Sequence, residues 1–176
     1  LTQALADEDA SAPGIIGDIR LGSGDDVMTV SAGTIAGDVS FGAGDDSLSL
    51  SGTSTLTGDT AFGTGSATLT LTDSAAIVGG VDFGGGSGTM TLGGTSSLTG
   101  AISNAGGTHV VLNGGTLDAS NAGSVALASL SASGTSTIGV TIDAANETNT
   151  LYDVAGAASF ATGSQVKVHL TQVGGS

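Results

Sequence analysis

The amino-acid sequence predicts an all-β protein, folded as a right-handed parallel β-helix (a β-solenoid) with about 20–21 residues per coil. One observation is a column of apolar residues at intervals of 20, 21, 21 and 21 residues, formed by Ile15, Ile35, Leu56, Ile77 and Leu98. The other is the alternation of apolar and small polar residues within each repeat, which is typical of half-buried strands. A repeat this short cannot bury its apolar face alone, so successive repeats should stack.

Three further apolar columns share this spacing and should line the interior of the stack. They are Leu21, Phe41, Phe62 and Phe83; Met28, Leu48, Leu69 and Met90; and Val30, Leu50, Leu71 and Leu92. Because stacked strands lie about 4.8 Å apart, we expect the rings of Phe41, Phe62 and Phe83 to form one buried stack. Glycine-rich segments form the corners, and the chain should make about seven coils.

The composition of the 176-residue chain fits one stacked domain. It has 32 Gly and no Cys, and its 16 acidic residues against two basic ones give a net charge of −14. A hydrophobic content of 39% is too high for a disordered acidic chain. The charge disfavours nucleic acid and anionic membranes as partners, and no apolar run reaches the roughly 18 residues of a membrane helix.

We divide the chain into three parts. Residues 1–14 carry the acidic run Asp7, Glu8 and Asp9, and form either a solvated lead or a cap on the first coil. Residues 15–116 form the regular coils. Residues 117–176, where the spacing loosens, form irregular C-terminal coils and a cap, as expected where a solenoid ends. In the last regular coil Asn104 takes the place of phenylalanine, and we expect it to point inward with a satisfied hydrogen bond.

Two acidic turns are candidate metal sites. Asp25 and Asp26 follow a Gly-Ser-Gly turn, and Asp45 and Asp46 follow a Gly-Ala-Gly turn one coil later. Stacked like charges favour a bound cation or free solvent. These turns resemble the calcium-binding nonapeptide of repeats-in-toxin proteins, with the first glycine replaced by a large apolar residue. The resemblance implies calcium as a ligand. The other interpretation is that the aspartates lie on solvated turns and only stabilise them through hydrogen bonds.

Other polar columns have structural and functional interpretations. Asp18, Asp38 and Asp59 adjoin glycines, where corner hydrogen bonds and solubility are the expected roles. Three outward columns carry hydroxyl groups: Thr29, Ser49, Thr70 and Thr91; Ser47, Thr68 and Thr89; and Ser31, Ser51 and Thr72. Hydroxyl side chains suit any exposed strand, and a regular array of them is also compatible with ice or carbohydrate binding.

We expect no enzymatic activity and no catalytic residues. Besides two histidines, the basic side chains are Arg20 and Lys167, near opposite ends of the chain. His109 should lie on an outward strand face, and His169 alternates with apolar residues near the C-terminus. No nucleophile motif surrounds a serine, and nothing bulky beside the aspartate pairs would grip a substrate.

Two stretches resemble the passenger domains of type V autotransporters of Gram-negative bacteria, which have a pertactin-like β-helix: GDVSFGAGDDSLSLSGTSTLTGD and STIGVTIDAANETNTLYDVAGAASFATGSQVKVHL. The likeness extends from residue 15 to about residue 170. It implies export through the outer membrane and display at the cell surface or release. It also implies that residues 117–176 include an autochaperone segment, and that an outer-membrane barrel is covalently linked outside this chain.

The expected function is that of a surface-displayed or secreted structural or adhesive stalk, acting in adhesion, aggregation or biofilm formation. Its partner would be itself or a ligand on a host or neighbouring cell. The alternative is a calcium-dependent β-solenoid module that folds after export. A second alternative is an ice-binding or carbohydrate-binding β-solenoid.

Overall fold

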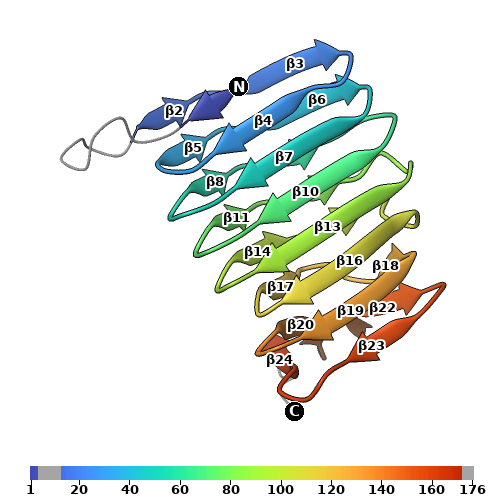
Figure 1. Ribbon diagram of the computed structural model, residues 1–176. Coiled ribbons are helices and arrows are strands. Elements are labelled where there is room, and N and C mark those ends of the chain that lie inside the picture. Colours follow the sequence, from blue (N-terminus) through green and yellow to red (C-terminus); the bar gives the residue numbers. More distant parts are fainter. Residues whose placement is uncertain (4–12, 172–176) are drawn as a thin grey trace.

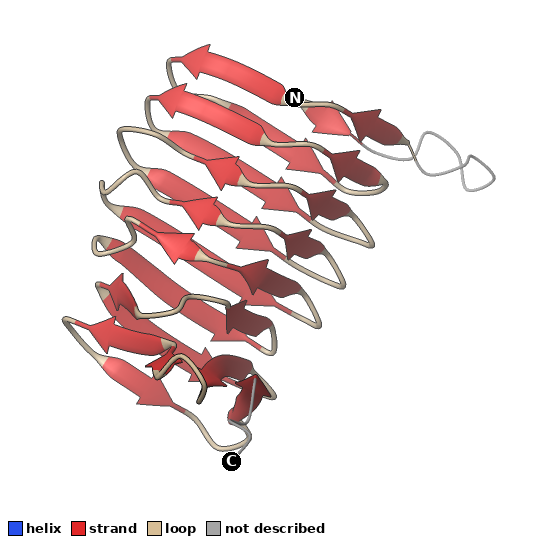
Figure 2. Cartoon of the chain, turned by 180° about the vertical axis from the view of Figure 1, so that it is seen from behind, coloured by secondary structure: helices blue, strands red, loops and turns tan. Residues whose placement is uncertain are grey.

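A computed structural model describes residues 1–3 and 13–171, and in these residues the chain forms only strands and turns (Figure 2). The strands stack into a parallel β-solenoid of about six turns (Figure 1), which confirms the predicted fold class. The described part of the chain has no helix with the length and apolar character of a membrane span. The acidic run at Asp7, Glu8 and Asp9 lies outside the described residues.

Three long sheets form the faces of the solenoid. Sheet A contains, in spatial order, β1 (Thr2–Gln3), β4 (Val27–Val30), β7 (Asp46–Leu50), β10 (Ala67–Leu71), β13 (Gly88–Gly93), β16 (Thr108–Asn113), β19 (Ser129–Ser133) and β23 (Ala158–Phe160). Sheet B contains β2 (Gly14–Ile16), β5 (Thr34–Ala36), β8 (Thr55–Thr57), β11 (Ala76–Val78), β14 (Ser97–Gly100), β17 (Thr116–Ala119), β20 (Thr137–Asp143) and β21 (Thr148–Asn149), with β24 (Gln165–Thr171) also paired to β20.

The third face is shorter and is completed by a separate pair of strands. Sheet C contains β3 (Ile19–Ser23), β6 (Val39–Ala43), β9 (Thr60–Ala61), β12 (Val81–Asp82) and β15 (Ile102–Ser103). Sheet D pairs β18 (Ser124–Leu127) with β22 (Leu151–Val154). At the first end of the stack, Thr2 pairs with Thr29, so the described start of the chain adds a strand to sheet A.

The register of the sheets reproduces the repeat in the sequence. In sheet A, Leu71 pairs with Leu50 on one side and Leu92 on the other, a step of 21 residues each way. In sheet B, Ile77 pairs in the same way with Leu56 and Leu98. Side chains one repeat apart therefore lie directly over one another.

These columns form one continuous core, which contains the apolar columns predicted from the sequence except for their first members Ile15 and Leu21, which are partly buried and pack against it. Leu50, Leu71 and Leu92 are fully buried. The rings of Phe41 and Phe62 stack with centroids 4.9 Å apart, and those of Phe62 and Phe83 with centroids 5.6 Å apart. The predicted phenylalanine stack is confirmed. Burying each such side chain contributes about 1.5–3 kcal/mol, so the stack is a main source of stability.

Glycine is required where consecutive coils meet at a corner. Gly63 has a φ of 76°, and a Cβ at this position would overlap the carbonyl oxygen of Gly42 in the coil before. Gly84 has the same relation to Gly63. This column needs both a left-handed backbone and the absence of a side chain, and only glycine provides both.

The prediction that Asn104 points inward is wrong. The register continues one step beyond the Asp82–Ser103 pair and aligns Asn104 with Phe83, but its φ of 52° turns the side chain outward. There it is exposed, and its Nδ2 donates to both carboxylate oxygens of Asp82, each at 2.9 Å. The phenylalanine stack therefore ends at Phe83.

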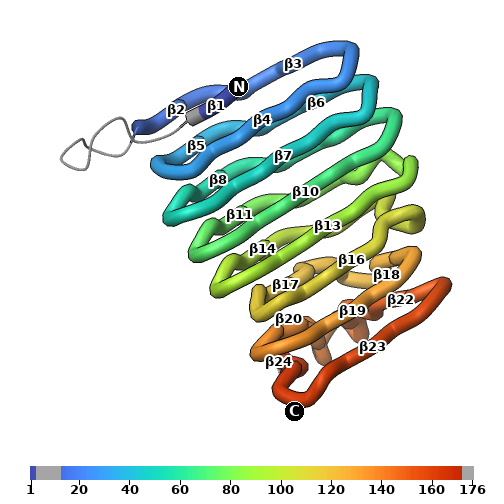
Figure 3. The backbone as a smooth tube through the Cα atoms, viewed as in Figure 1, coloured from blue at the N-terminus to red at the C-terminus, as the bar shows by residue number. Residues whose placement is uncertain are grey.

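The chain makes about six turns rather than the expected seven because its last coil is longer. Ile138 pairs with Val166 and Leu130 with Ala158, so both steps are 28 residues. Part of the extra length is a hairpin in which β20 and β21 pair antiparallel. Figure 3 shows regular coils as far as β16 and a less regular path after it.

Candidate functional site

The four aspartates of the acidic turns stack in two columns, and the carboxylates of three of them accept hydrogen bonds from backbone N–H groups. The N–H of Asp45 donates to Oδ1 of Asp25 at 2.8 Å, and the N–H of Ser66 donates to Oδ1 of Asp45 at 2.8 Å. In the second column, the N–H of Asp26 donates to Oδ1 of Asp46 at 3.0 Å. These bonds link neighbouring coils and satisfy N–H groups that the corners would otherwise leave unpaired.

Asp46 differs from the other three because it is buried, with only 2% of its surface exposed. It is the first residue of β7 and lies two positions before Leu48, so its side chain points to the core. The prediction of a solvated turn is therefore wrong for Asp46. Oδ2 of Asp46 and Oδ2 of Asp26 have no hydrogen-bond partner among the described residues. Buried carboxylate oxygens without partners are energetically unfavourable, so this pair is the most unusual polar feature of the interior.

A complete metal-ligand set is not evident around this pair. Within residues 1–3 and 13–171, no group of three or more His, Cys, Asp or Glu side chains is placed to hold a metal ion. The structure brings the four candidate ligands together as two stacked pairs, Asp25 with Asp45 and Asp26 with Asp46. Further oxygen ligands for calcium would have to come from backbone carbonyls, hydroxyls or water.

The second acidic column has the structural role expected from the sequence. The N–H of Asp38 donates to Oδ1 of Asp18 at 3.1 Å, and the N–H of Asp59 donates to Oδ1 of Asp38 at 2.8 Å. The N–H of Gly80 continues the series with a 2.6 Å bond to Oδ1 of Asp59. These three aspartates are exposed, so the same residues also supply surface charge.

Two shallow pockets of about 290 and 280 Å³ follow this corner between sheets B and C, and they share Asp59 and Ala61. At one end, Nη2 of Arg20 lies 3.4 Å from Oδ2 of Asp18, an exposed ion pair that contributes little stability. At the other end is Asp82. Burial pushes its pKa up, but hydrogen bonds from Asn104, Gly84 and Ser103 outweigh this, so the pKa lies below its usual value.

Two of the three outward hydroxyl columns align on sheet A as the sequence indicates. The third, Ser31, Ser51 and Thr72, lies just past the ends of strands β4, β7 and β10. Thr68 pairs with Ser47 and Thr89, and Thr70 pairs with Ser49 and Thr91. The next coil breaks the array, because His109, Val111 and Asn113 occupy the corresponding positions. We call the six residues Ser47, Ser49, Thr68, Thr70, Thr89 and Thr91 the hydroxyl face.

The two imidazoles lie in different surroundings. Nδ1 of His109 is 2.8 Å from the hydroxyl of Ser129 on the exposed side of sheet A. Nε2 of His169 is 2.9 Å from Oδ2 of Asp118 on sheet B. A serine and a histidine are in contact on an open strand face, but catalysis also requires an orienting acid and a water-excluding cavity.

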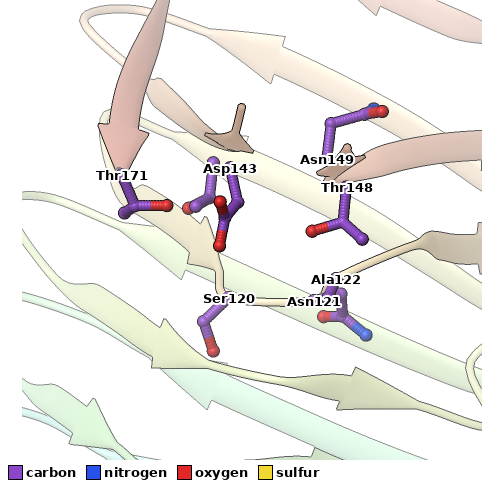
Figure 4. A pocket seen from close by; sticks show the side chains of 8 residues that line it. Ser120, Asn121, Ala122, Asp143, Thr148, Asn149 and Thr171 are labelled. Atoms are coloured by element: carbon purple, nitrogen blue, oxygen red, sulfur yellow. The ribbon is translucent and has the colours of Figure 1, made fainter. Parts of the chain in front are cut away.

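A third pocket, missed by the sequence analysis, lies near the C-terminal hairpin. It has a volume of about 180 Å³, and its lining, drawn in Figure 4, consists of Ala122 and seven small polar side chains: Ser120, Asn121, Thr141, Asp143, Thr148, Asn149 and Thr171. Hydrogen bonds from Asn146, first from its side chain and then from its N–H, hold the pKa of Asp143 below its usual value. The lining offers hydroxyls, amides and one carboxylate to a small polar molecule but no aromatic surface. The sequence signal was the cluster of Asn, Thr and Ser in the irregular region.

Nothing among the protein-family models, the curated proteins or the solved structures matches this chain. The resemblances to autotransporter passengers and to repeats-in-toxin turns therefore stay hypotheses.

Proposed function

We propose that the chain is a structural or adhesive stalk, displayed on or released from the surface of a Gram-negative bacterium, and that it is the passenger part of an autotransporter. The observation that supports this is the form of the solenoid. One unbroken core runs through it, and the first and last described residues lie at opposite ends of the stack (Figure 1). A protein built this way holds its two ends apart and presents a repetitive surface between them.

In this proposal the contacts are made by repetition rather than by a catalytic centre. The hydroxyl face presents the same short polar groups in successive coils, so an extended partner meets several equivalent weak contacts. Many weak contacts that act together give strong attachment to a cell or to a second stalk. The chain acts in adhesion, aggregation or biofilm formation without chemical turnover, and a covalently linked outer-membrane barrel brings it to the surface.

Display on a Gram-negative host tests the proposal. The chain is fused to a translocating barrel, its exposure is checked by protease treatment of whole cells, and aggregation is followed by the settling of the cells. We expect the displayed chain to cause aggregation and the double variant Thr68→Lys/Thr89→Lys to lose it, because long charged side chains block close contact on the hydroxyl face.

The matched control is Thr57→Lys/Thr99→Lys, which adds the same charges at exposed positions on sheet B. This control should aggregate like the parent. Failure of the chain to reach the surface would contradict export. Equal settling of the parent, both variants and cells without the chain would contradict adhesion.

A calcium-dependent module is the second candidate, and the buried Oδ2 atoms of Asp26 and Asp46 favour it. A cation bound there would give these atoms the partner that they lack. We expect titration calorimetry to show heat on calcium addition and the melting temperature to rise with calcium. Asp46→Asn should bind no calcium and melt at the same temperature with calcium or chelator. Absence of heat and of any melting shift in the parent chain would end this candidate.

A further inference from the structure

The end of the solenoid formed by the last coil leaves apolar columns uncovered. Phe160 is 52% exposed and Val166 60%, whereas residues of the same columns in the interior are 0–3% exposed. Leu170, which is 67% exposed, pairs with Ile142, which is itself 36% exposed. Val168, between two of them on β24, is also exposed. We call Phe160, Val166, Val168 and Leu170 the C-terminal face. Solenoids that remain single usually end in a repeat with a polar outer face, and the residues described as far as Thr171 form no such repeat.

The opposite end of the solenoid is also incompletely covered. Ile15, Ile19 and Leu21 belong to the same kind of apolar column but are only partly buried. They lie on β2 and β3, the terminal strands of sheets B and C. We call Ile15, Ile19 and Leu21, with the edges of these two strands, the N-terminal face.

Within residues 1–3 and 13–171, both ends of the stack finish in edge strands that have a strand neighbour on one side only. At one end these are β1, β2 and β3, and at the other they include β23 and β24. Such edges are templates for pairing with another chain. Because each of these strands runs parallel to its neighbour in the stack, a solenoid placed end to end in the same direction continues the parallel pairing.

We propose that the C-terminal face of one copy binds the N-terminal face of a second copy, so that the solenoids join head to tail. The register supports a second copy of the chain as the partner that covers the C-terminal face. The column of sheet B that begins at Ile15 ends with Ile138 and then Val166. In a second copy stacked on this end, the next residue of the column is Ile15 of that copy. Val166 beneath Ile15 repeats the contact that Ile138 makes with Val166 inside one chain.

The geometry also fixes the form of the assembly. The two faces differ, so the contact is heterologous and leaves one free face of each kind, which allows further copies to add. The net charge of −14 on each copy opposes this contact, so salt that screens the repulsion should strengthen the association. This association is independent of the stalk function and applies to the chain alone.

Sedimentation velocity of the 176-residue chain, measured over a wide concentration range at low and high salt, tests the proposal. We expect a series of species that grows with concentration and with salt. Val166→Asp should weaken the association by about tenfold or more, because it places a charge in the contact. Gln165→Asp is the matched control: it adds the same charge to the neighbouring exposed position, on the opposite side of β24, and should associate like the parent.

A mixing experiment tests the direction of the contact. Val166→Asp keeps its N-terminal face, so a small amount added to the parent should occupy free C-terminal faces and shorten the assemblies, whereas Gln165→Asp should not. Circular dichroism should show that both variants are folded, because both positions are exposed. A monomer under all conditions, a dimer that never grows, or equal effects of the two variants would overturn the proposal.

Discussion

The interior coils and the last coil share apolar columns, yet members of one column differ sharply in burial between the two regions. Leu117 and Val166 belong to one column of sheet B, and the first is fully buried while the second is 60% exposed. Both are large aliphatic residues on strands. The difference teaches that burial in a solenoid depends on a neighbour above and a neighbour below, rather than on the residue or its local pattern.

The two regions also close their interiors by different means. Interior coils use glycine corners and close apolar stacking. Beyond β15 a side chain replaces the next strand as the hydrogen-bond partner of the backbone. The side chain of Asn121 accepts a hydrogen bond from the Ile102 N–H at 2.9 Å and donates one to the Ile102 carbonyl at 2.8 Å. In the last coil the hydroxyl of Tyr152 donates to the carbonyl of Gly139 at 3.0 Å. The end of the stack therefore depends on specific polar contacts, and the middle depends on repetition.

The largest contrast is expected between Phe62→Asp and Phe160→Asp. A charge at Phe62 would sit in the centre of the ring stack, so we expect a loss above about 4 kcal/mol and no folded protein. The same change at the half-exposed Phe160 should alter the free energy of unfolding by about 1 kcal/mol or less. Thermal melts by circular dichroism measure both. A cooperative melt of Phe62→Asp near the parent temperature would show that the column is not buried.

The second contrast compares two glycines of one corner column. Gly63→Ala forces a Cβ into the carbonyl oxygen of Gly42 and should lower stability by about 3 kcal/mol or more. Gly22→Ala, in the first described coil, meets no atom within 4 Å and carries only the strain of a φ of 107°, about 1–2 kcal/mol. Urea unfolding compares the two variants, and equal losses would show that backbone conformation alone decides this column.

Tyr152 gives the last coil a dependence of stability on alkaline pH. Burial raises its pKa to about 12, although the hydrogen bond from the Ala119 N–H opposes this shift. In the unfolded chain the tyrosine hydroxyl ionises near pH 10. The contribution of Tyr152 to the free energy of unfolding is therefore fully present below pH 10, and it falls by about 2–3 kcal/mol as the pH rises towards 12. Tyr152→Phe should remove this alkaline loss. An unchanged alkaline loss of stability in that variant would assign it to other groups.

The smallest contrast concerns surface aspartates. Asp59→Ala removes the acceptor for the N–H of Gly80 and should lower the free energy of unfolding by about 1 kcal/mol. Asp153→Ala changes an exposed residue of the last coil and should stay within about 0.5 kcal/mol of the parent. The denaturant midpoints of the two variants measure these changes in stability. If Asp59→Ala unfolds at the same midpoint as the parent, the column of Asp18, Asp38 and Asp59 serves solubility alone.

The sequence was sufficient to predict the parallel solenoid, its core columns and the stacking of Phe41, Phe62 and Phe83, because all of these follow from one fixed repeat length. It was insufficient where a single backbone angle decides the outcome: Asn104 keeps its place in the register but turns away from the core. The burial of Asp46 depends on β7 beginning at that residue, which a turn motif does not reveal. The polar pocket beside Asp143 was missed because its walls come from segments that only the long last coil brings together.

The direction of the hydrogen bonds between coils has a mechanical consequence. In each sheet they run roughly along the axis of the stack, so tension between the two ends loads them one coil at a time rather than all together. Under tension such a solenoid should unfold one coil at a time from an end. Each unfolded repeat of 21 residues would add about 70 Å of extended chain. A solenoid pulled at its two ends should therefore lengthen coil by coil as the load rises, instead of failing in one step.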